Sequence, residues 1–537
     1  MKRGLPEGAL PAGRASAFSP LRHRLFRTIW LALLASNLGI WIQTVAAGWL
    51  MTTLVSAADM VALVQSATAL PGLLFSLPGG LMADWWDRRK ALLVSQALLF
   101  AGAALLALLD GTGGMTPWLL LSLIFVTGAG AALRLPAYQA VLGDMVPPRD
   151  VPQAVALGAV AYNLARAAGP ALGGVIVASC GVFTAFVVGA VLNVVLCVVL
   201  LAWRPERPVS DLPREPFGRA LAGGFHYLRQ TRPVLATMAH CAAFTTFASA
   251  LWALLPLVAR DDAPDAPSRY GVLLACMGAG ATLGAIGFPR LRDRLSGPPL
   301  IAVGLVAFAA GTVLPAVSPS LWLQVPGLVL AGAAWMTTLT SFNVMVQFSS
   351  ASWVRARMLA LYYISMHAGI AFGSWVSGVV ADRAGLETAL LAAALALLAS
   401  LGLFPLFRLP RHSADDLAPI DDLPPADLAP GVEPGRDPIV VQVTYRVVAE
   451  DGAGFRRAMD GIRRIRARDG ARRWTLAQNA GRPECWVESF EVGTWVEDQR
   501  RRRRMTMSDR ETFLAARRFH RGADKPRVSR WIIRGPR

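Results

Sequence analysis

The sequence predicts an all-α polytopic membrane protein of twelve transmembrane helices, in two pseudo-symmetric halves of six, followed by a small α+β domain. Twelve long apolar stretches fill roughly the first 410 of 537 residues, and a helix needs about 20 mostly apolar residues to cross a bilayer. Only 16% of the residues are charged, whereas about a quarter are charged in a soluble protein. Strand and helix patterns in residues 438–537 indicate the additional domain.

Each apolar stretch is expected to form a helix, because backbone groups inside lipid have to hydrogen-bond within their own segment. The expected spans are 29–53, 60–83, 91–110, 117–137, 153–179, 182–203, 234–258, 271–289, 299–316, 321–347, 358–381 and 386–407. A basic segment, residues 1–28, precedes them. The first stretch is too long for a cleaved signal peptide and is therefore expected to remain as a span.

The distribution of lysine and arginine predicts which side of the membrane the loops face. With the N-terminus inside, 24 of these residues in positions 1–412 fall on the cytoplasmic side, and only Arg260, Arg269 and Arg383 fall outside. The positive-inside rule describes this asymmetry. An even number of spans then places both termini in the cytoplasm.

The longest loop between spans, residues 204–233, divides the spans six and six. It separates an N-terminal half, 29–203, from a C-terminal half, 234–410. The halves also resemble each other, since the loops after spans 4 and 10 both introduce the next span with arginine. Two six-span halves related by an axis along the membrane normal are the plan of one large class of transporters.

The chain is expected to leave the membrane after residue 410. Residues 411–437 are rich in proline and aspartate without periodicity, as in an extended linker. In residues 438–537, strand-like alternation and helix-like spacing follow one another in the order βαββαβ. That order is typical of a ferredoxin-like sheet with helices on one face. We expect this cytoplasmic domain to form a homodimer or to regulate the membrane part.

The loop between spans 2 and 3 combines glycine, aspartate and arginine. Gly80 allows close helix approach, and Asp84 is followed by Arg88 and Arg89. One interpretation is a gating motif, in which the ion pair changes partners as the two halves rock. The alternative is ordinary charge at the end of a span, which only fixes the orientation.

Span 5 carries a charge and a run of small residues. Arg166 is expected near mid-depth, where a charge is costly unless it is paired or hydrated and therefore indicates function. The alternative is a shallow position from which the side chain reaches the headgroups. Gly169, Pro170, Gly173 and Gly174 allow close helix packing and bending. We expect this motif to serve the rocking motion rather than to contact substrate.

These motifs carry a resemblance to a known family. The loop at 80–89, the Gly-Pro run at 163–174 and the sequence GSWVSGVVADRAG at 373–385 resemble the major facilitator superfamily. The likeness is to its bacterial twelve-span efflux branch, which includes enterobactin and macrolide exporters. It implies proton-coupled, secondary active export of a small amphipathic molecule by alternating access across the bacterial cytoplasmic (inner) membrane. Trp85 and Asp87 depart from the basic and small residues that are usual in this loop.

The carrier of a coupled proton is harder to locate in the sequence. No aspartate or glutamate is expected at mid-depth in any span, and His240 and His367 are the histidines within spans. A histidine titrates near neutral pH, although a buried histidine is more often a hydrogen-bonded core residue. Arg134 and Asp144, across the turn between spans 4 and 5, are a further candidate ion pair.

Polar residues within apolar spans are candidates for lining a substrate cavity. They are Asn37, Gln43, Asn163, His240, Asn343, Gln347 and His367. The alternative for each is a hydrogen bond that only holds neighbouring helices together.

The sequence does not favour an enzyme. The five cysteines show no metal-ligand or disulfide spacing, and no catalytic constellation accompanies His520. We therefore expect no catalytic residue, metal or cofactor, and no nucleic-acid partner. The C-terminal domain also resembles small cofactor-less monooxygenases. The alternative function is therefore a membrane-tethered enzyme or sensor whose working part is this domain.

Overall fold

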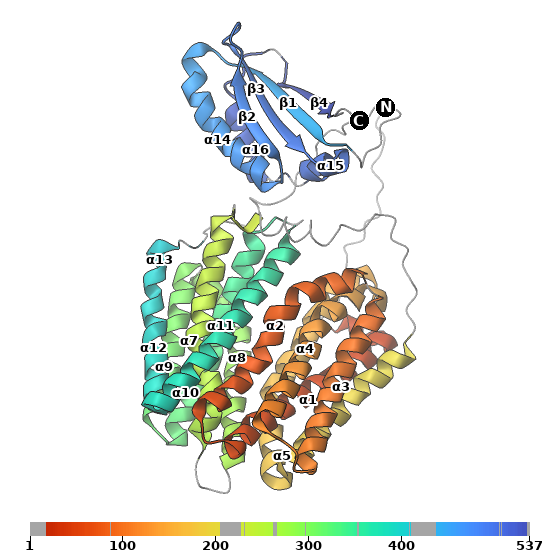
Figure 1. The fold of residues 1–537 in the computed structure, drawn as a ribbon, viewed down its shortest axis with the longest axis vertical. Helices are drawn as coiled ribbons and strands as arrows, with labels where there is room; N and C mark the ends of the chain where they lie inside the picture. Colours follow the sequence, from red (N-terminus) through yellow and green to blue (C-terminus); the bar gives the residue numbers. More distant parts are fainter. Residues whose placement is uncertain are drawn as a thin grey trace, which may run out of the picture. The chain divides into compact units, whose positions relative to one another are not determined.

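The computed structural model describes residues 18–533 except 86, 204–226, 230, 261–265, 296, 352–353, 408, 410–436, 504, 506 and 523. Within these residues, 11 helices are long and apolar enough to cross a membrane, so the chain is a mostly helical, multi-pass membrane protein (Figure 1). Most of the predicted N-terminal segment, central loop and linker lie outside the described residues.

The helices follow one another with short connections. Their bounds are α1 (Arg24–Leu54), α2 (Ala58–Trp85), α3 (Arg88–Gly111), α4 (Pro117–Met145), α5 (Val151–Ala202), α7 (Arg232–Ala259), α8 (Ala266–Arg294), α9 (Pro298–Val317), α10 (Leu321–Phe348), α11 (Arg355–Ala384), α12 (Leu386–Ala399) and α13 (Leu403–Leu406). Lys90, Arg149 and Arg294 mark one end of the helices, which we call the basic ends.

The structure has 11 such helices rather than twelve because the predicted spans 153–179 and 182–203 form one element, α5. An uninterrupted helix of its 52 residues would be about 78 Å long. Two helices in fact meet at Gly181, whose φ of 85° and ψ of 170° are not helical. A positive φ is accessible to glycine without steric cost, so the chain reverses here without a loop.

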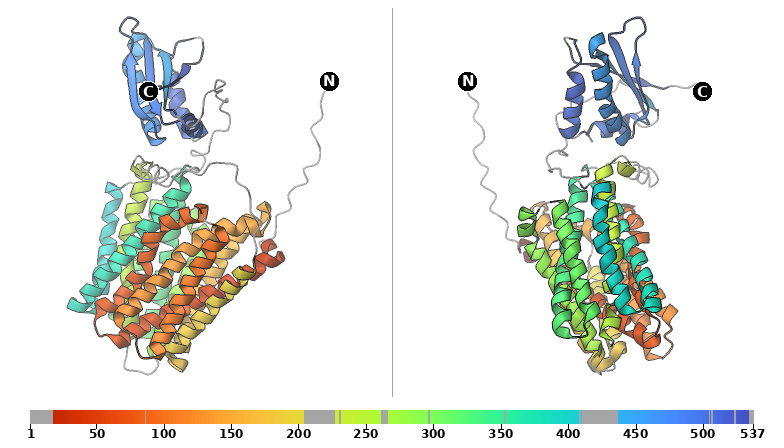
Figure 2. Two further views of the ribbon diagram at one scale, coloured as in Figure 1. Left: turned by 45° about the vertical axis from the view of Figure 1, so that its right-hand side comes forward. Right: turned by 90° about the vertical axis from the view of Figure 1, so that its left-hand side faces the viewer.

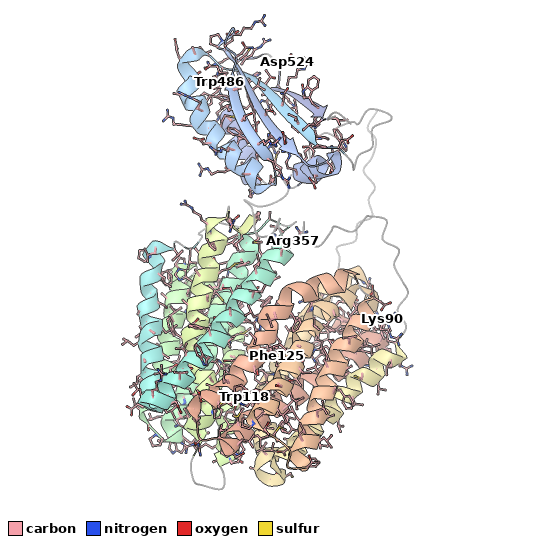
Figure 3. The ribbon with its side chains drawn as sticks, in the orientation of Figure 1. Lys90, Trp118, Phe125, Arg357, Trp486 and Asp524 are labelled. Atoms are coloured by element: carbon pink, nitrogen blue, oxygen red, sulfur yellow. The ribbon has the colours of Figure 1, made fainter. Side chains whose placement is uncertain are left out.

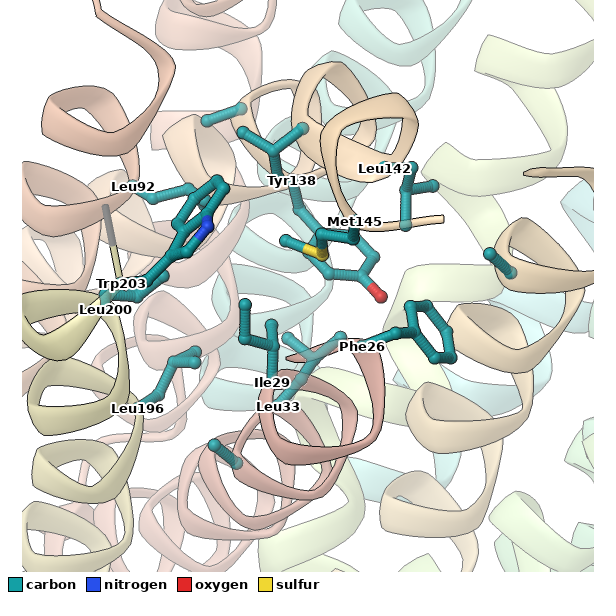
Figure 4. Packing of buried hydrophobic residues seen from close by; sticks show 14 of the residues in the cluster. Phe26, Ile29, Leu33, Leu92, Tyr138, Leu142, Met145, Leu196, Leu200 and Trp203 are labelled. Atoms are coloured by element: carbon teal, nitrogen blue, oxygen red, sulfur yellow. The ribbon is translucent and has the colours of Figure 1, made fainter. Parts of the chain in front are cut away.

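Apolar side chains hold the first five helices together. One cluster near the basic ends joins Phe26 and Ile29 of α1, Tyr138 of α4, and Leu196 and Leu200 of α5 (Figure 4). Burying each large apolar side chain contributes roughly 1.5–3 kcal/mol relative to water. Inside a bilayer that gain disappears, and packing contacts hold the helices together instead.

The perimeter of the bundle is also apolar. Trp118 at the start of α4 is 68% exposed and Trp322 at the start of α10 is 90% exposed (Figure 3 labels Trp118). Leu395 of α12 is 69% exposed. Large exposed side chains of this kind are costly in water but suit lipid, and tryptophan is enriched where the hydrocarbon meets the headgroups.

Contacts between residues divide the chain into two compact units. One unit contains residues 1–212, 239–341 and 363–406, and therefore most of the helices. The other contains residues 213–238, residues 342–362 and the C-terminal part from 407 onwards.

The C-terminal domain is a four-stranded antiparallel sheet with helices packed on one face (Figures 1 and 2). Its elements are β1 (Ile439–Arg446), α14 (Gly452–Arg468), β2 (Arg472–Gln478), β3 (Cys485–Val492), α15 (Trp495–Arg503), α16 (Met507–Arg517) and β4 (Arg527–Ile532). The strand order is β2-β3-β1-β4. Alternate residues of β1 and β3 point to the core, where Tyr445 and Trp486 meet Phe455 and Met459 of α14.

Candidate functional site

Two groups of helices, α1–α5 and α7–α12, meet along two seams. In the first seam α5 packs against α8, and a Cβ built on Gly174 would lie 2.7 Å from the Cα of Gly271. Only glycine permits this approach, since a side chain would push the two helices apart. Farther along α5, the carbonyl oxygen of Arg166 lies 2.5 Å from a Cβ built on Gly278 of α8.

In the second seam α2 packs against α11. The backbone amide of Ala58 donates a hydrogen bond to Oδ1 of Asp382 (3.2 Å), and the hydroxyl of Ser66 donates to the carbonyl oxygen of Ala371 (2.8 Å). Ala58 and Asp382 lie at the helix ends opposite the basic ends. The described contacts between the two groups thus extend from mid-depth to the ends opposite the basic ends.

Arg166 lies where the two groups meet. It is midway between Val151 and Gly181, about 22 Å along the helix from either. Its Nη2 donates to Oδ1 of Asn163 (2.8 Å) and contacts the sulfur of Met336 on α10 (3.7 Å). The side chain is 7% exposed, so the protein encloses it, and its mid-depth position in the membrane stays a prediction.

Two observations around Arg166 were not anticipated from the sequence. The guanidinium lies over the ring of Tyr162, 5.8 Å from its centroid, and Tyr162 in turn contacts Trp41 of α1 with ring centroids 6.4 Å apart. The buried Nε of Arg166 has no hydrogen-bond partner in the described part of the chain. The i, i+4 spacing of Tyr162 and Arg166 is a signal that could have indicated their shared helix face.

Arg134 of α4 is buried among neutral polar side chains of α1. Its Nη1 donates to the hydroxyl of Ser36 (2.8 Å) and its Nη2 donates to Oδ1 of Asn37 (2.6 Å). Ser36 donates onward to Oδ1 of Asn193 (2.7 Å), which also accepts from Gln96 (3.0 Å). The hydrogen bonds of Arg134 therefore go to these neutral side chains, and a pairing with Asp144 is not among them.

The span-5 glycines pack against two other helices, α1 and α8. A Cβ on Gly169 would lie 2.5 Å from the Cβ of Trp41, and a Cβ on Gly173 would lie 3.1 Å from the Cα of Ile42, so these two pack on α1. Gly174 and the carbonyl oxygen of Pro170 pack instead on α8. The motif thus joins α5 both to its own helix group and to the other one.

His367 of α11 lies at the α2–α11 seam. A Cβ built on Gly72 of α2 would lie 2.7 Å from Cγ of the ring, so the ring rests directly on the α2 backbone. Nδ1 lies 2.7 Å from the carbonyl oxygen of Tyr363. Since a carbonyl only accepts, Nδ1 carries the hydrogen in neutral histidine, and Nε2 is then the ring nitrogen that can accept.

The other predicted polar residues have contacts of their own. His240 stacks on Phe404, with ring centroids 4.7 Å apart. Gln43 faces Gly189 of α5, within the first helix group. Nε2 of Gln347 donates to Oδ1 of Asn343 (2.5 Å) on the same helix. Among the predicted polar residues, Asn163 accepts a hydrogen bond from Arg166 and Asn37 accepts one from Arg134.

The predicted gating motif is described in part. The structure does not describe the surroundings of Gly80 or the side chains of Asp84 and Arg88. Arg89 donates from Nε to the carbonyl oxygen of Leu200 (2.9 Å) and from Nη2 to that of Leu201 (2.6 Å). These are carbonyls of the last turn of α5, which a cation stabilises. Arg89 therefore joins α3 to the end of α5.

Asp87, which departs from the family's usual residue, has a structural role. Its side chain accepts a hydrogen bond from the backbone amide of Lys90 (3.1 Å) and caps the N-terminus of α3. Aspartate is among the best residues at this position. The sequence D-R-R-K before an apolar run could have revealed the cap.

The C-terminal domain buries several ion pairs. Arg466 of α14 donates to both oxygens of the fully buried Glu488 of β3 (2.9 and 3.3 Å). Within α15, Arg501 donates to the equally buried Asp498 (2.6 Å), which also accepts from Arg530 of β4 (2.8 Å). Burial alone would raise the pKa of Glu488, but Arg466 beside it holds that pKa below its usual range. Asp498 behaves in the same way, because Arg501 and Arg530 lower its pKa.

The same domain has a shallow pocket of about 570 Å³ between α14 and β2, lined in part by Arg463, Trp474 and Trp486. No group of histidine, cysteine, aspartate and glutamate able to hold a metal ion occurs among the described residues.

A known protein family matches this chain along almost its whole length. The sequence fits the family described as transmembrane secretion effector over residues 15–536. The chain belongs to this family. The transmembrane secretion effector family comprises transporters of the major facilitator superfamily, and the alternative of a membrane-tethered enzyme finds no support.

The relatives of this family member are efflux proteins. The multidrug efflux pump Tap of Mycobacterium tuberculosis is 26% identical over 410 residues, which cover 74% of this chain and 96% of Tap. The enterobactin exporter EntS of Salmonella typhimurium is 26% identical over 362 residues, which cover 66% of this chain and 85% of EntS.

Solved structures share the fold. A mutant of the nucleoside transporter NupG superposes with a TM-score of 0.60 over 72% of this chain and 100% of that protein, at 16% identity. A bacterial homolog of the human lysosomal transporter Spinster superposes with a TM-score of 0.56 over 72% of this chain and 95% of that protein, at 16% identity.

Proposed function

We propose that this transmembrane secretion effector exports a small amphipathic molecule by alternating access, from a binding site at mid-depth between its two helix groups. The position of Arg166 carries the proposal. Midway along its span, Arg166 touches α8 through its backbone and α10 through its side chain. Rocking of the two groups would change both contacts, and a molecule bound there would be exposed to one side at a time.

The proposed architecture is a twelve-span bundle. Gly181 lies between the two predicted spans that α5 joins, and its backbone reversal supports counting α5 as two spans. Trp118 and Trp322 each occupy the second position of their helix, α4 and α10, which supports two pseudo-symmetric six-span halves, residues 29–203 and 234–410. The arginine distribution supports cytoplasmic termini, and the bacterial relatives support the inner membrane.

The substrate class follows from the relatives and the site together. Tap is a multidrug efflux pump and EntS an enterobactin exporter. Aromatic rings of Trp41 and Tyr162 beside a buried cation suit a molecule with a flat apolar part and a polar part. A siderophore, a macrolide or another drug-like compound has this character.

We assign the coupled proton to His367. Its Nε2 is the ring nitrogen that can accept, and it rests on α2 at the seam between the two helix groups. A proton on Nε2 would add a charge and a donor at a contact with backbone atoms, which favours separation of α2 from α11. The predicted gate of Gly80, Asp84 and Arg88 would act at the basic ends, with Arg89 tying α3 to α5.

The C-terminal domain is proposed to adopt a ferredoxin-like fold and to form a homodimer. The strand order β2-β3-β1-β4 and the helices on one face support the fold. The other face of the sheet, which includes Thr475 and Ala477 on β2, carries exposed side chains to pair with a second copy. The linker at 411–437 would give this domain freedom to regulate transport.

Transport by the full chain in liposomes tests the function and its coupling. An imposed pH gradient should drive flux of dyes such as fluorescein or rhodamine 123, of a siderophore or of a macrolide. His367→Gln should abolish the gradient dependence while retaining gradient-free exchange, and His240→Gln is the matched control because His240 stacks on Phe404 away from the seam. Equal gradient dependence in His367→Gln and in the wild type would disprove the coupling role. Absence of flux for every compound would disprove export.

A further inference from the structure

The arginines at mid-depth in the first helix group lack acidic partners. Arg134 donates to Ser36 and Asn37, and Arg166 donates to Asn163 and contacts Met336. In the described part of the chain, no carboxylate lies within hydrogen-bonding distance of either guanidinium. Buried charges are normally paired, because removing a charge from water without a partner is costly.

The two arginines belong to one cluster. On antiparallel helices α4 and α5, Arg134 and Tyr162 lie at about the same depth, with Arg166 one turn further along. Tyr162 lies near both guanidinium groups, and its ring centroid is 5.8 Å from Cζ of Arg166. It is 47% exposed, although Arg134 and Arg166 are 8% and 7% exposed. The tyrosine ring is therefore the accessible element beside two enclosed positive charges.

The guanidinium of Arg166 has hydrogen-bond donors that the described residues leave unsatisfied or weakly satisfied. Nε of Arg166 is enclosed and without a partner, and the thioether of Met336 is at 3.7 Å a weak acceptor for Nη2. An oxygen anion would satisfy Nε and replace the sulfur as the acceptor of Nη2. A guanidinium binds such an anion through two parallel hydrogen bonds, which are roughly twice as strong as neutral ones.

We propose that Arg166 binds the anionic group of the exported molecule, and that the positive electrostatic field of Arg134 assists it. The substrate is accordingly an organic anion with an aromatic body, such as an aromatic carboxylate or a catecholate, whose ring packs on Tyr162 and Trp41. This inference rests on the proposed function and specifies its substrate class. Displacement of Met336 would also make binding of the anion loosen the contact between α5 and α10.

Two dyes with a common xanthene ring system test the charge selectivity. Fluorescein is an anion and rhodamine 123 a cation, so their ratio separates charge from shape. Liposomes of phosphatidylcholine containing the full wild-type chain should transport fluorescein at least about tenfold faster than rhodamine 123, which corresponds to the ~1.4 kcal/mol of one charged hydrogen bond. Measurable transport of both dyes at similar rates would overturn the proposal.

Variants of the cluster locate the selectivity. Arg166→Gln should lower the fluorescein flux about tenfold or more and leave the rhodamine 123 flux unchanged. Arg166→Lys should retain much of the fluorescein flux. Arg383→Gln is the matched control, since Arg383 is exposed at the end of α11. An equal loss for both dyes in Arg166→Gln would assign the arginine a structural role and overturn the proposal.

A binding measurement separates this inference from the proposed function. Fluorescence anisotropy of fluorescein with the wild type in phosphatidylcholine nanodiscs should give saturable binding, weakened about tenfold or more in Arg166→Gln. If neither dye is transported but this difference holds, export of such dyes fails while the anion site stands. A different result would contradict the proposal. If fluorescein binds both proteins equally, and the Arg166→Gln protein retains less bound phosphatidylglycerol than the wild type, the site holds a lipid headgroup and the proposal fails.

Discussion

Buried arginines occur in both parts of the molecule, and their partners differ. In the C-terminal domain, Arg466 and Arg501 meet Glu488 and Asp498, so charge is balanced within the fold. In the helix bundle, Arg166 is equally enclosed but meets an amide oxygen and a thioether. The difference teaches that balanced charge fixes the packing of a sheet against its helices, whereas the unbalanced charge of Arg166 is the observation on which the proposed anion site rests.

The largest effect is expected from Glu488→Gln in the C-terminal domain. Loss of this carboxylate leaves Arg466 buried without a counter-charge, which should lower the free energy of unfolding by about 3–5 kcal/mol. Urea denaturation of residues 437–537 measures it. The matched control is Glu491→Gln, because its partner Arg473 is 80% exposed and such pairs contribute about 0–1 kcal/mol. If both substitutions lower the free energy of unfolding equally, the buried ion pair is no more important to stability than the exposed one.

Acidification should have the next largest effect on the same domain. The pKa values of Glu488 and Asp498 are lowered in the folded state, so their stabilisation is present above their unfolded pKa of about 4 and is lost as pH falls through the folded values. Burial raises the pKa of Asp469, and protonation of this residue offsets part of the loss. Unfolding followed by circular dichroism should therefore begin below about pH 4 in the wild type. A domain whose stability does not change between pH 6 and pH 3 would contradict this expectation.

Arg166→Met should have the smallest effect on stability. Methionine removes a charge that has no counter-charge, so the free energy of unfolding should change by less than about 1 kcal/mol, while fluorescein flux is lost. Thermal unfolding of the detergent-solubilised chain measures the first quantity and liposome transport the second. A destabilisation as large as that of Glu488→Gln would show that Arg166 fixes packing as Arg466 does.

Much of the fold could be predicted from the sequence because lipid imposes simple rules. Length and apolar content located the spans, and alternation located all four strands of the C-terminal domain. The predicted spans 153–179 and 182–203 break at the position of the non-helical Gly181, although their helices follow each other without a loop and form the single element α5. Asp87 was treated as a departure from a family pattern, although its position before an apolar run is that of a helix cap.

The site could be predicted only in part. The distance of Arg166 from the start of its span predicts a mid-depth position, and in the structure Arg166 lies midway between Val151 and Gly181. Its neighbours Tyr162 and Met336 were not found, because a span that is apolar on all sides gives no sign of its rotation or of the helix that faces it. The same uncertainty explains why Gln43 and His240, polar residues in comparable positions, turned out to face other helices.

The abrupt reversal at Gly181 gives the chain a natural chemical handle. Cys180, directly before it, is exposed, whereas the other cysteines, Cys197, Cys241, Cys276 and Cys485, are buried or partly buried. A thiol at a hairpin tip can be modified by a membrane-impermeant maleimide added to intact cells. The unaltered protein therefore carries its own topology reporter. The compartment from which the reagent modifies Cys180 determines the orientation of every helix.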